Sequence, residues 1–259
     1  MHFVKPKKSL GQHFLKDNNI ANKIVDSLDN KSKNVLEIGP GTGILTKFLI
    51  NKKHNLKLVE IDKESVSFLI SQMSIDKNII IENDFLKLDL YKVFNGEKFS
   101  IIGNFPYNIS SQIVFKILEN RNIINEMSGM FQYEVAERIC EPEGSKKYGI
   151  LSVLTQAFFD VELLFEVSNH LFIPPPKVKS AVILLKRKEL IDLECDEDLF
   201  FKIVKLSFQQ RRKTIRNSLK KINLSNNLRE DSIFDYRPEQ LSVNQFIKLT
   251  KLVQGDLKM

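Results

Sequence analysis

The chain has 259 residues, of which 42% are apolar and 27% are charged, so it is long enough for one large domain or two modest ones. This composition is that of an ordinary globular protein, and it excludes collagen-like, low-complexity and wholly disordered classes. The longest uncharged run, 99–115, is interrupted by Gly103 and Pro106, which is not typical of a membrane-spanning helix.

Two cysteines, Cys140 and Cys195, are too few for a disulfide framework or a four-cysteine zinc site. The N-terminus is basic, but no apolar segment of a signal peptide follows it. We therefore expect reduced thiols and a cytoplasmic protein. His54 and His170 belong to no ligand pattern, so no metal site is predicted.

The positive charge is concentrated in two segments. Residues 1–16 hold four lysines and no acidic residue, and residues 202–221 hold eight lysines or arginines and no acidic residue. The whole chain has a net charge of only +7, so the remainder is net negative. Two basic segments on an otherwise acidic chain favour a polyanionic partner such as nucleic acid.

Apolar periodicity and glycine turns predict an alternation of strands and helices. The strands are expected at 34–38, 56–61, 79–81, 100–103, 127–132, 161–167 and 181–185. The helices are expected at 18–28, 44–49, 64–73, 110–120, 135–139, 196–206 and 243–253. This order indicates an α/β domain over 1–187, with a mostly parallel sheet covered on both faces, and a small all-helical domain over 188–259.

Ligands of open parallel sheets bind beyond the carboxyl ends of the strands. The first strand ends in a glycine turn, 39–43, the second in Glu60, the third in Asp84 and the fourth in Asn104. Small residues let a ligand approach the backbone, an acid after the second strand can accept two ribose hydroxyls, and an acid after the third can accept the amine of an adenine. The ends of the four strands therefore predict a nucleoside site.

The glycine turn differs from that of a dinucleotide-binding protein. The third glycine of that fingerprint would fall at position 44, which is Ile44 here. A phosphate-binding P-loop is also absent, because no Lys-Ser or Lys-Thr pair follows the glycines. A nucleoside without a pyrophosphate fits better, and S-adenosylmethionine is such a ligand.

The segment 104–107, Asn-Phe-Pro-Tyr, has a structural and a chemical interpretation. Asn and Pro are typical turn residues. An amide beside an aromatic ring can also prepare the exocyclic amine of a base for methylation. The Asn104 side-chain oxygen and a backbone carbonyl of the turn would accept both amine hydrogens, which aims the nitrogen lone pair at a methyl donor. Tyr107 would stack on the base.

These motifs resemble those of the ribosomal RNA adenine N6-dimethyltransferases. The resemblance rests on 9–15 (SLGQHFL), 37–43 (EIGPGTG), 104–110 (NFPYNIS) and 172–178 (FIPPPKV), which occur in the family's order. The segment 210–219 (QRRKTIRNSL) is similar to the helical domain of the ribosome-biogenesis branch. The similarity extends over about residues 7–220.

The resemblance implies a Rossmann-like methyltransferase domain followed by a helical RNA-binding domain. It implies four methyl transfers from S-adenosylmethionine to two adjacent adenosines in the 3′-terminal hairpin of small-subunit rRNA. We expect small-subunit rRNA or a pre-30S particle as the partner, no membrane partner, and a monomer. Asn104 and Tyr107 would be catalytic. The implied cofactor-binding residues are His13, Leu15, Gly39, Glu60, Asp84 and Asn104. His13 departs from the asparagine that is usual there.

Other interpretations remain open. The same core motifs would serve a dimethylase of large-subunit rRNA that confers macrolide resistance, a DNA adenine methyltransferase, or a non-catalytic RNA-binding assembly factor. Phe172 either covers the second face of the target base or packs in the core. The basic segment 202–221 has an amphipathic pattern that also occurs at membranes, although we favour RNA phosphate as its partner.

Overall fold

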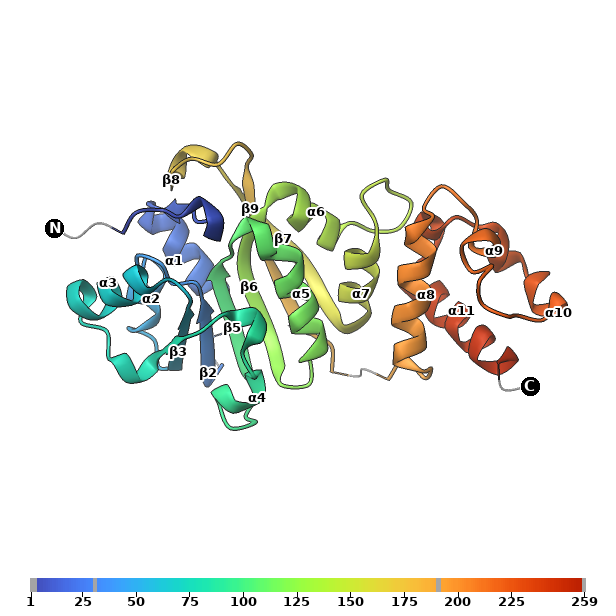
Figure 1. The fold of residues 1–259 in the computed structure, drawn as a ribbon, viewed down its shortest axis with the longest axis horizontal. Coiled ribbons are helices and arrows are strands. Elements are labelled where there is room, and N and C mark those ends of the chain that lie inside the picture. The colour runs from blue at the N-terminus through green and yellow to red at the C-terminus, as the bar shows by residue number, and fades with distance from the viewer. Residues whose placement is uncertain (1–3, 30–31, 190–191, 258–259) are drawn as a thin grey trace. The chain divides into compact units, whose positions relative to one another are not determined.

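The computed structural model describes residues 4–29, 32–189 and 192–257, and its chain forms two compact units (Figure 1). The first unit comprises residues up to 136 together with 160–187, and the second comprises 137–159 together with the residues from 188 onward. One division falls between residues 187 and 188, and the two domains expected on either side of that point stay a prediction. Residues 137–159, which the sequence pattern placed in the first domain, group with the C-terminal helices. Residues 1–3, 30–31, 190–191 and 258–259 of the two expected domains lie outside the described residues.

A seven-stranded sheet in the order β4-β3-β2-β5-β6-β9-β7 forms the centre of the first unit. Its strands are β2 (Asn34–Ile38), β3 (Asn55–Glu60), β4 (Ile80–Glu82), β5 (Phe99–Asn104), β6 (Ile124–Gln132), β7 (Phe159–Val167) and β9 (Ser180–Arg187). The pairs from β4 to β6 are parallel, and β6 pairs with β9 antiparallel. All seven expected strands are present, and the sheet is mostly parallel as predicted.

Both faces of the central strands are covered. Every residue of β2 is buried, as are the first five residues of β5 and six successive residues of β9. Because successive side chains of a strand point to opposite faces, such runs require packing on both sides. Ile24 of α1 belongs to one apolar cluster with Val35 and Ile102 of the sheet, and all three side chains are fully buried.

The helices of the first unit are α1 (Asn18–Asp26), α2 (Thr46–Leu49), α3 (Lys63–Met73), α4 (Leu90–Val93), α5 (Ser110–Glu119) and the start of α6 (Tyr133–Cys140). Asp17 and Asp62 cap α1 and α3 by accepting backbone N–H groups, which explains why these helices begin where they do. A two-stranded sheet pairs β1 (Phe14–Leu15) with β8 (Phe172–Ile173). The sequence pattern did not predict this pairing.

The second unit is helical in the part of the chain that the structure describes. It contains α7 (Ile150–Phe158), α8 (Glu197–Gln209), α9 (Ile215–Ser218), α10 (Asn226–Arg229) and α11 (Val243–Asp256). Phe158 of α7 contacts Phe200 and Phe201 of α8, and Phe208 contacts Phe246 of α11. Helix α7 is new relative to the sequence analysis. Among the described residues, every helix is too short or too polar to cross a bilayer.

Candidate active site

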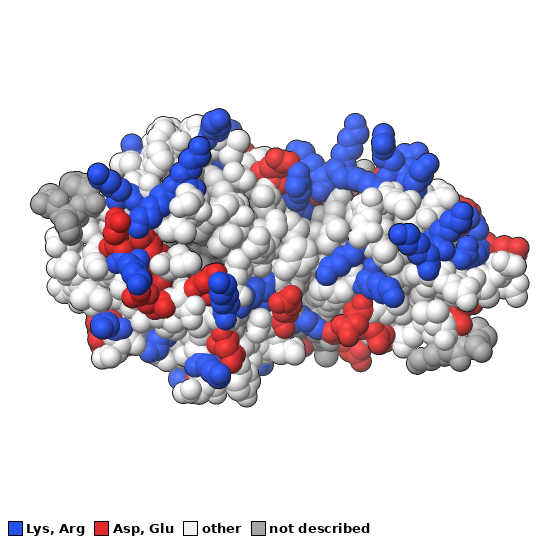
Figure 2. Space-filling view, viewed as in Figure 1, with Lys and Arg blue, Asp and Glu red and all other residues white. Residues whose placement is uncertain are grey.

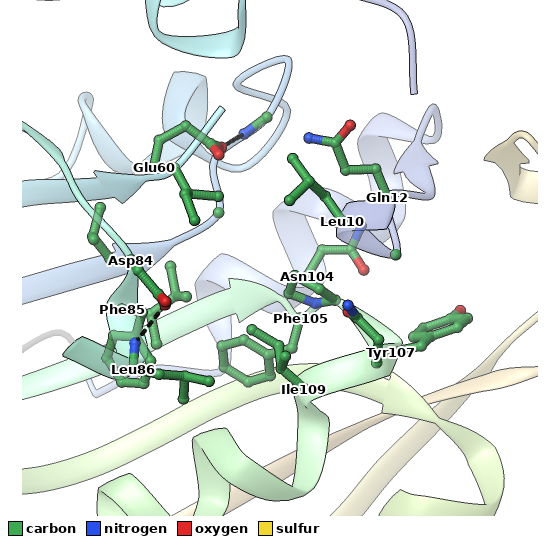
Figure 3. Close-up of a pocket in the computed structure, with 18 of the residues that line it drawn as sticks. Leu10, Gln12, Glu60, Asp84, Phe85, Leu86, Asn104, Phe105, Tyr107 and Ile109 are labelled. Atoms are coloured by element: carbon green, nitrogen blue, oxygen red, sulfur yellow. Dashed lines mark hydrogen bonds between the residues drawn. The ribbon is translucent and has the colours of Figure 1, made fainter. Parts of the chain in front are cut away.

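The candidate site is a cavity of about 170 Å³ at the carboxyl edge of the parallel strands. Its walls come from the residues that follow β2, β3, β4 and β5, and from residues 10–14 of the N-terminal segment. In Figure 3, Glu60 and Asp84 lie on one side of the view, Asn104 lies between, and Tyr107 points away from the two carboxylates. The strand ends that the sequence analysis singled out therefore do meet in one cavity.

The glycine turn leaves the backbone bare where it faces the cavity. Gly39 has φ +65°, and a Cβ added there would meet no atom within 4 Å. Gly41 has φ +56°, and a Cβ added there would come within 2.8 Å of the Phe14 ring. Both positions need the left-handed conformation that glycine adopts without strain. Only Gly39 has room beside it for a ligand.

Glu60 is 4% exposed, and both of its carboxylate oxygens accept backbone hydrogen bonds. Oε2 accepts from Gly41 N at 3.0 Å (Figure 3), and Oε1 accepts from Asp62 N at 2.9 Å. Burial raises the pKa of Glu60, and the backbone donors oppose that shift. These bonds fix the carboxylate against the glycine turn, while the second lone pair of each oxygen remains as acceptor capacity for ligand hydroxyls.

Asp84 caps the turn after β4. Its Oδ1 accepts from Leu86 N at 2.9 Å (Figure 3), and its second oxygen has no hydrogen-bond partner among the described residues. Phe85 and Leu86 line the same wall of the cavity. A free carboxylate oxygen beside apolar side chains suits the amine edge and the flat face of an adenine. The apolar part of this wall was missed from sequence, although Phe85 and Leu86 directly follow the acid.

Asn104 ends β5, and its amide has a defined orientation. Nδ2 donates to the carbonyl of His13 at 2.8 Å. Because a carbonyl can only accept, the NH₂ end of the amide must face His13. Oδ1 has no partner among the described residues and is left as an acceptor beside the cavity.

Tyr107 lines the cavity and is held from two sides. Its hydroxyl lies 2.5 Å from Ser180 Oγ, and its ring stacks on the His13 imidazole with centroids 5.1 Å apart and planes at 26°. Burial raises the pKa of Tyr107, with the Ser180 bond acting in the opposite direction. The ring is therefore fixed in place before any ligand binds, with one face against His13.

The residues of the N-terminal segment take different positions. His13 lines the cavity, but its Nδ1 donates to the Pro174 carbonyl at 2.8 Å and its ring lies on Tyr107. Leu15 is 2% exposed; it is not among the residues that line this cavity, and it lines a neighbouring cavity of about 20 Å³ together with Glu37. Phe172, paired with Leu15 across β1 and β8, is 1% exposed, so its ring is packing and cannot reach a base.

Glu37, in β2, is a buried acid that the sequence analysis did not single out. It is 1% exposed, and its Oε2 accepts from Thr46 Oγ1 at 2.7 Å. Burial raises its pKa to about 8, with the Thr46 bond opposing the shift. At neutral pH this carboxyl carries a proton.

We expect the protein to become less stable as pH rises from about 5 to 8. The unfolded chain loses the Glu37 proton near its ordinary pKa of 4.5, whereas the folded chain keeps that proton up to about 8. The folded state thus binds more protons in this window, so rising pH favours unfolding by at most about 1.4 kcal/mol per pH unit. Thermal unfolding of Glu37→Gln across the window should show a flatter pH dependence. The exposed Glu119→Gln variant should follow the wild type, and equal slopes for all three proteins would contradict the assignment.

No group of three or more His, Cys, Asp or Glu side chains in residues 4–29, 32–189 and 192–257 is placed to hold a metal ion. All residues around the cavity belong to the first unit. The sheet order, with the acceptors Glu60, Asp84 and Asn104 at its carboxyl edge, is that of a Rossmann-like methyltransferase.

The chain belongs to the ribosomal RNA adenine dimethylase family, whose sequence model matches residues 4–254. It is therefore an rRNA adenine dimethyltransferase that depends on S-adenosylmethionine. It is 61% identical over 257 residues to "Ribosomal RNA small subunit methyltransferase A" of Flavobacterium johnsoniae, covering 99% of this chain and 98% of the relative. The protein of the same name from Bacteroides thetaiotaomicron is 55% identical, covering 100% of this chain and 97% of the relative.

Two solved structures are similar along most of their length. A dimethyladenosine transferase from Plasmodium falciparum has a TM-score of 0.78 and 26% identity, covering 92% of this chain and 96% of that one. The 23S rRNA methyltransferase ErmE has a TM-score of 0.68 and 26% identity, covering 92% of this chain and 99% of that one. These matches agree with the Rossmann-like fold predicted from the motifs.

Proposed function

We propose that this chain dimethylates N6 of two adjacent adenosines in the 3′-terminal hairpin of small-subunit rRNA, during maturation of the small ribosomal subunit. The observation that carries the proposal is the high identity, over nearly the whole chain, to relatives named for the small subunit. The rRNA or a pre-30S particle would be the partner. A monomer in the cytoplasm, without a membrane partner, is part of the same proposal.

The cavity fits the cofactor by the chemistry of its donors and acceptors. Gly39 leaves room for the methionine part, the fixed Glu60 carboxylate accepts the ribose hydroxyls, and the free oxygen of Asp84 accepts the adenine amine. S-adenosylmethionine supplies an electrophilic methyl group on its sulfonium. Three residues of the proposed set remain. Asn104 would face both the cofactor and the target base, and the His13 carbonyl holds the Asn104 amide in position. Leu15 is buried and would support the cavity wall from behind.

Asn104 and Tyr107 would prepare the target amine. The Asn104 Oδ1 accepts one N6 hydrogen, and a backbone carbonyl of the 104–107 turn accepts the other, which favours a pyramidal nitrogen with its lone pair directed at the methyl group. The Tyr107 face opposite His13 would stack on the base, a contact worth roughly 1–3 kcal/mol. No general base is needed before transfer, because the proton leaves from the acidified ammonium afterwards.

The second unit would bind RNA phosphate. Figure 2 shows Lys and Arg side chains gathered on the surface of this unit. The basic residues of 202–221 are Lys202, Lys205, Arg211, Arg212, Lys213, Arg216, Lys220 and Lys221. Arg211 donates to the Ser145 carbonyl at 3.0 Å and Arg216 pairs with Asp235 at 2.6 Å, so these two also support the fold. Arg212 and Lys213 are exposed.

Charge reversal at Arg212 and Lys213 should weaken RNA binding without unfolding the unit. The salt dependence of log affinity should become shallower by about 0.9 for each RNA phosphate that the variant no longer neutralises. Fluorescence anisotropy with a hairpin RNA over a salt series measures both effects. Reversal at Lys33 and Lys52, which lie in the first unit, is the control. An unchanged slope in the first variant would remove these residues from the RNA interface.

The proposed substrate is tested by transfer of tritiated methyl groups to ribosomal subunits from cells that lack this activity. We expect label only in small subunits, recovered as N6,N6-dimethyladenosine. Large subunits are run in parallel, because the similarity to ErmE makes 23S rRNA the second candidate. Label in the large subunit would overturn the assignment. Absence of label from both, with cofactor bound, would point to a DNA substrate or to a non-catalytic assembly factor.

A further inference from the structure

Asp62 is a buried acid beside the cavity, and it has no part in the cofactor binding or the methyl transfer proposed for this site. It follows β3 and lies two residues after Glu60, and it is 2% exposed. Its side chain caps α3 by accepting from Glu64 N at 3.2 Å and from Ser65 Oγ at 3.2 Å. A helix cap uses only part of the acceptor capacity of a carboxylate, and further donors reach Asp62 from a distant part of the chain.

Those donors are Lys7 and Gln12 of the N-terminal segment. Lys7 Nζ lies 2.5 Å from Asp62 Oδ1 and 3.0 Å from Glu64 Oε1, and Gln12 Nε2 donates to Asp62 Oδ2 at 3.1 Å. Gln12 Oε1 in turn accepts from Lys7 N at 2.7 Å, which closes a ring of hydrogen bonds. Burial acts against ionisation of Asp62, but the bonds from Lys7 and Gln12 outweigh it and lower its pKa.

His13 follows Gln12, and its backbone carbonyl orients the side-chain amide of Asn104. The His13 carbonyl accepts from Asn104 Nδ2 and so determines which end of that amide faces the cavity. On its far side the segment is anchored by the β1–β8 pair and by Lys16 N, which donates to the Leu171 carbonyl at 2.9 Å. Asp62 is therefore the upstream anchor of a segment whose residues 10–14 line the cavity.

We propose that Asp62 is a positioning residue which, by binding Lys7 and Gln12, holds residues 7–13 over the cofactor cavity and keeps the His13 carbonyl against Asn104. This inference rests on the proposed roles of the cavity and of Asn104. Asp62 would thereby link the end of β3, where Glu60 would bind the ribose, to Asn104, which would bind the target amine. Loss of the anchor should weaken cofactor binding and also slow the transfer step.

The test removes the two donors and leaves Asp62 in place as the cap of α3. We expect Lys7→Met with Gln12→Leu to bind S-adenosylhomocysteine about tenfold more weakly by calorimetry, as loss of charge-assisted hydrogen bonds predicts. The kcat for methyl transfer at saturating cofactor should fall as well, and amide hydrogen exchange of residues 8–13 should accelerate. The thermal midpoint should stay near that of the wild type, because α3 keeps its cap.

Lys33→Met is the matched control, since it breaks an exposed ion pair with Glu97 (2.9 Å) elsewhere in the same unit. This variant should behave as the wild type in all four measurements. A double variant with wild-type affinity, kcat and exchange would overturn the inference while the proposed function stands. If the wild type itself transfers no methyl group, the proposed function fails, and calorimetry with hydrogen exchange still decides whether Asp62 anchors the segment.

Discussion

We expect Asn104→Ala to lose methyl transfer by at least about a hundredfold in kcat, the size of effect seen when one preorganised polar group is removed from an active site. Alanine cannot accept the N6 hydrogen, and it also releases the His13 carbonyl from its hydrogen bond. RNA binding should be unchanged, because the basic surface of the second unit is untouched. Single-turnover transfer at saturating cofactor and RNA measures the loss.

The control for this variant is Asn120→Ala. Asn120 directly follows the last residue of α5 and does not line the cavity. Its side-chain amide donates to the Lys116 carbonyl at 2.9 Å, so this variant also removes one amide–carbonyl hydrogen bond from the first unit. Its transfer rate should equal that of the wild type. A rate for Asn104→Ala within about tenfold of the wild type, with RNA bound, would contradict the mechanism proposed for the amide.

The second large effect is expected for Gly39→Val, which should abolish cofactor binding. The added side chain has no protein atom within 4 Å of its Cβ and would occupy space that we assign to the methionine part of the cofactor. Its φ of +65° also costs a non-glycine residue roughly 1–2 kcal/mol of strain. Calorimetry should show S-adenosylhomocysteine affinity reduced by more than about a hundredfold, as filling a preformed site requires.

Gly144→Val separates blocking of the cavity from strain of the backbone. Gly144 has φ +93° and likewise has no atom within 4 Å of an added Cβ, but it lies in the second unit. Both variants should lose stability to a similar degree, and only Gly39→Val should lose the cofactor. If both bound the cofactor equally well, the methionine part could not lie against Gly39.

The strands and helices that the sequence predicted correctly are those with strong local signals. The strand expected at 34–38 has the same bounds in the structure, because a short apolar run ends in a glycine turn that no strand or helix can continue through. Helix α7 was missed although its apolar residues recur at helical spacing, with Ser152, Thr155 and Gln156 between them. It ends at Phe158 and β7 begins at Phe159, so no turn residue marks the change from helix to strand.

The meeting of Gly39, Glu60, Asp84 and Asn104 could also be predicted from sequence. Parallel strands joined by helices bring their carboxyl ends to one edge of a sheet, so residues that follow successive strands become neighbours. The identity of each side chain then suggests its chemistry. For this part of the site, the order of elements along the chain was enough.

Only the tertiary structure decided what the N-terminal segment does. Leu15 and Phe172 are buried because β1 pairs with β8, and the His13 carbonyl reaches Asn104 because Asp62 and β8 hold the segment at both ends. These contacts join residues far apart in sequence, and a carbonyl or a two-residue strand leaves no pattern in the amino-acid types. The sequence by itself determined the sheet and the acceptors at its edge, and long-range packing decided how the segment covers them.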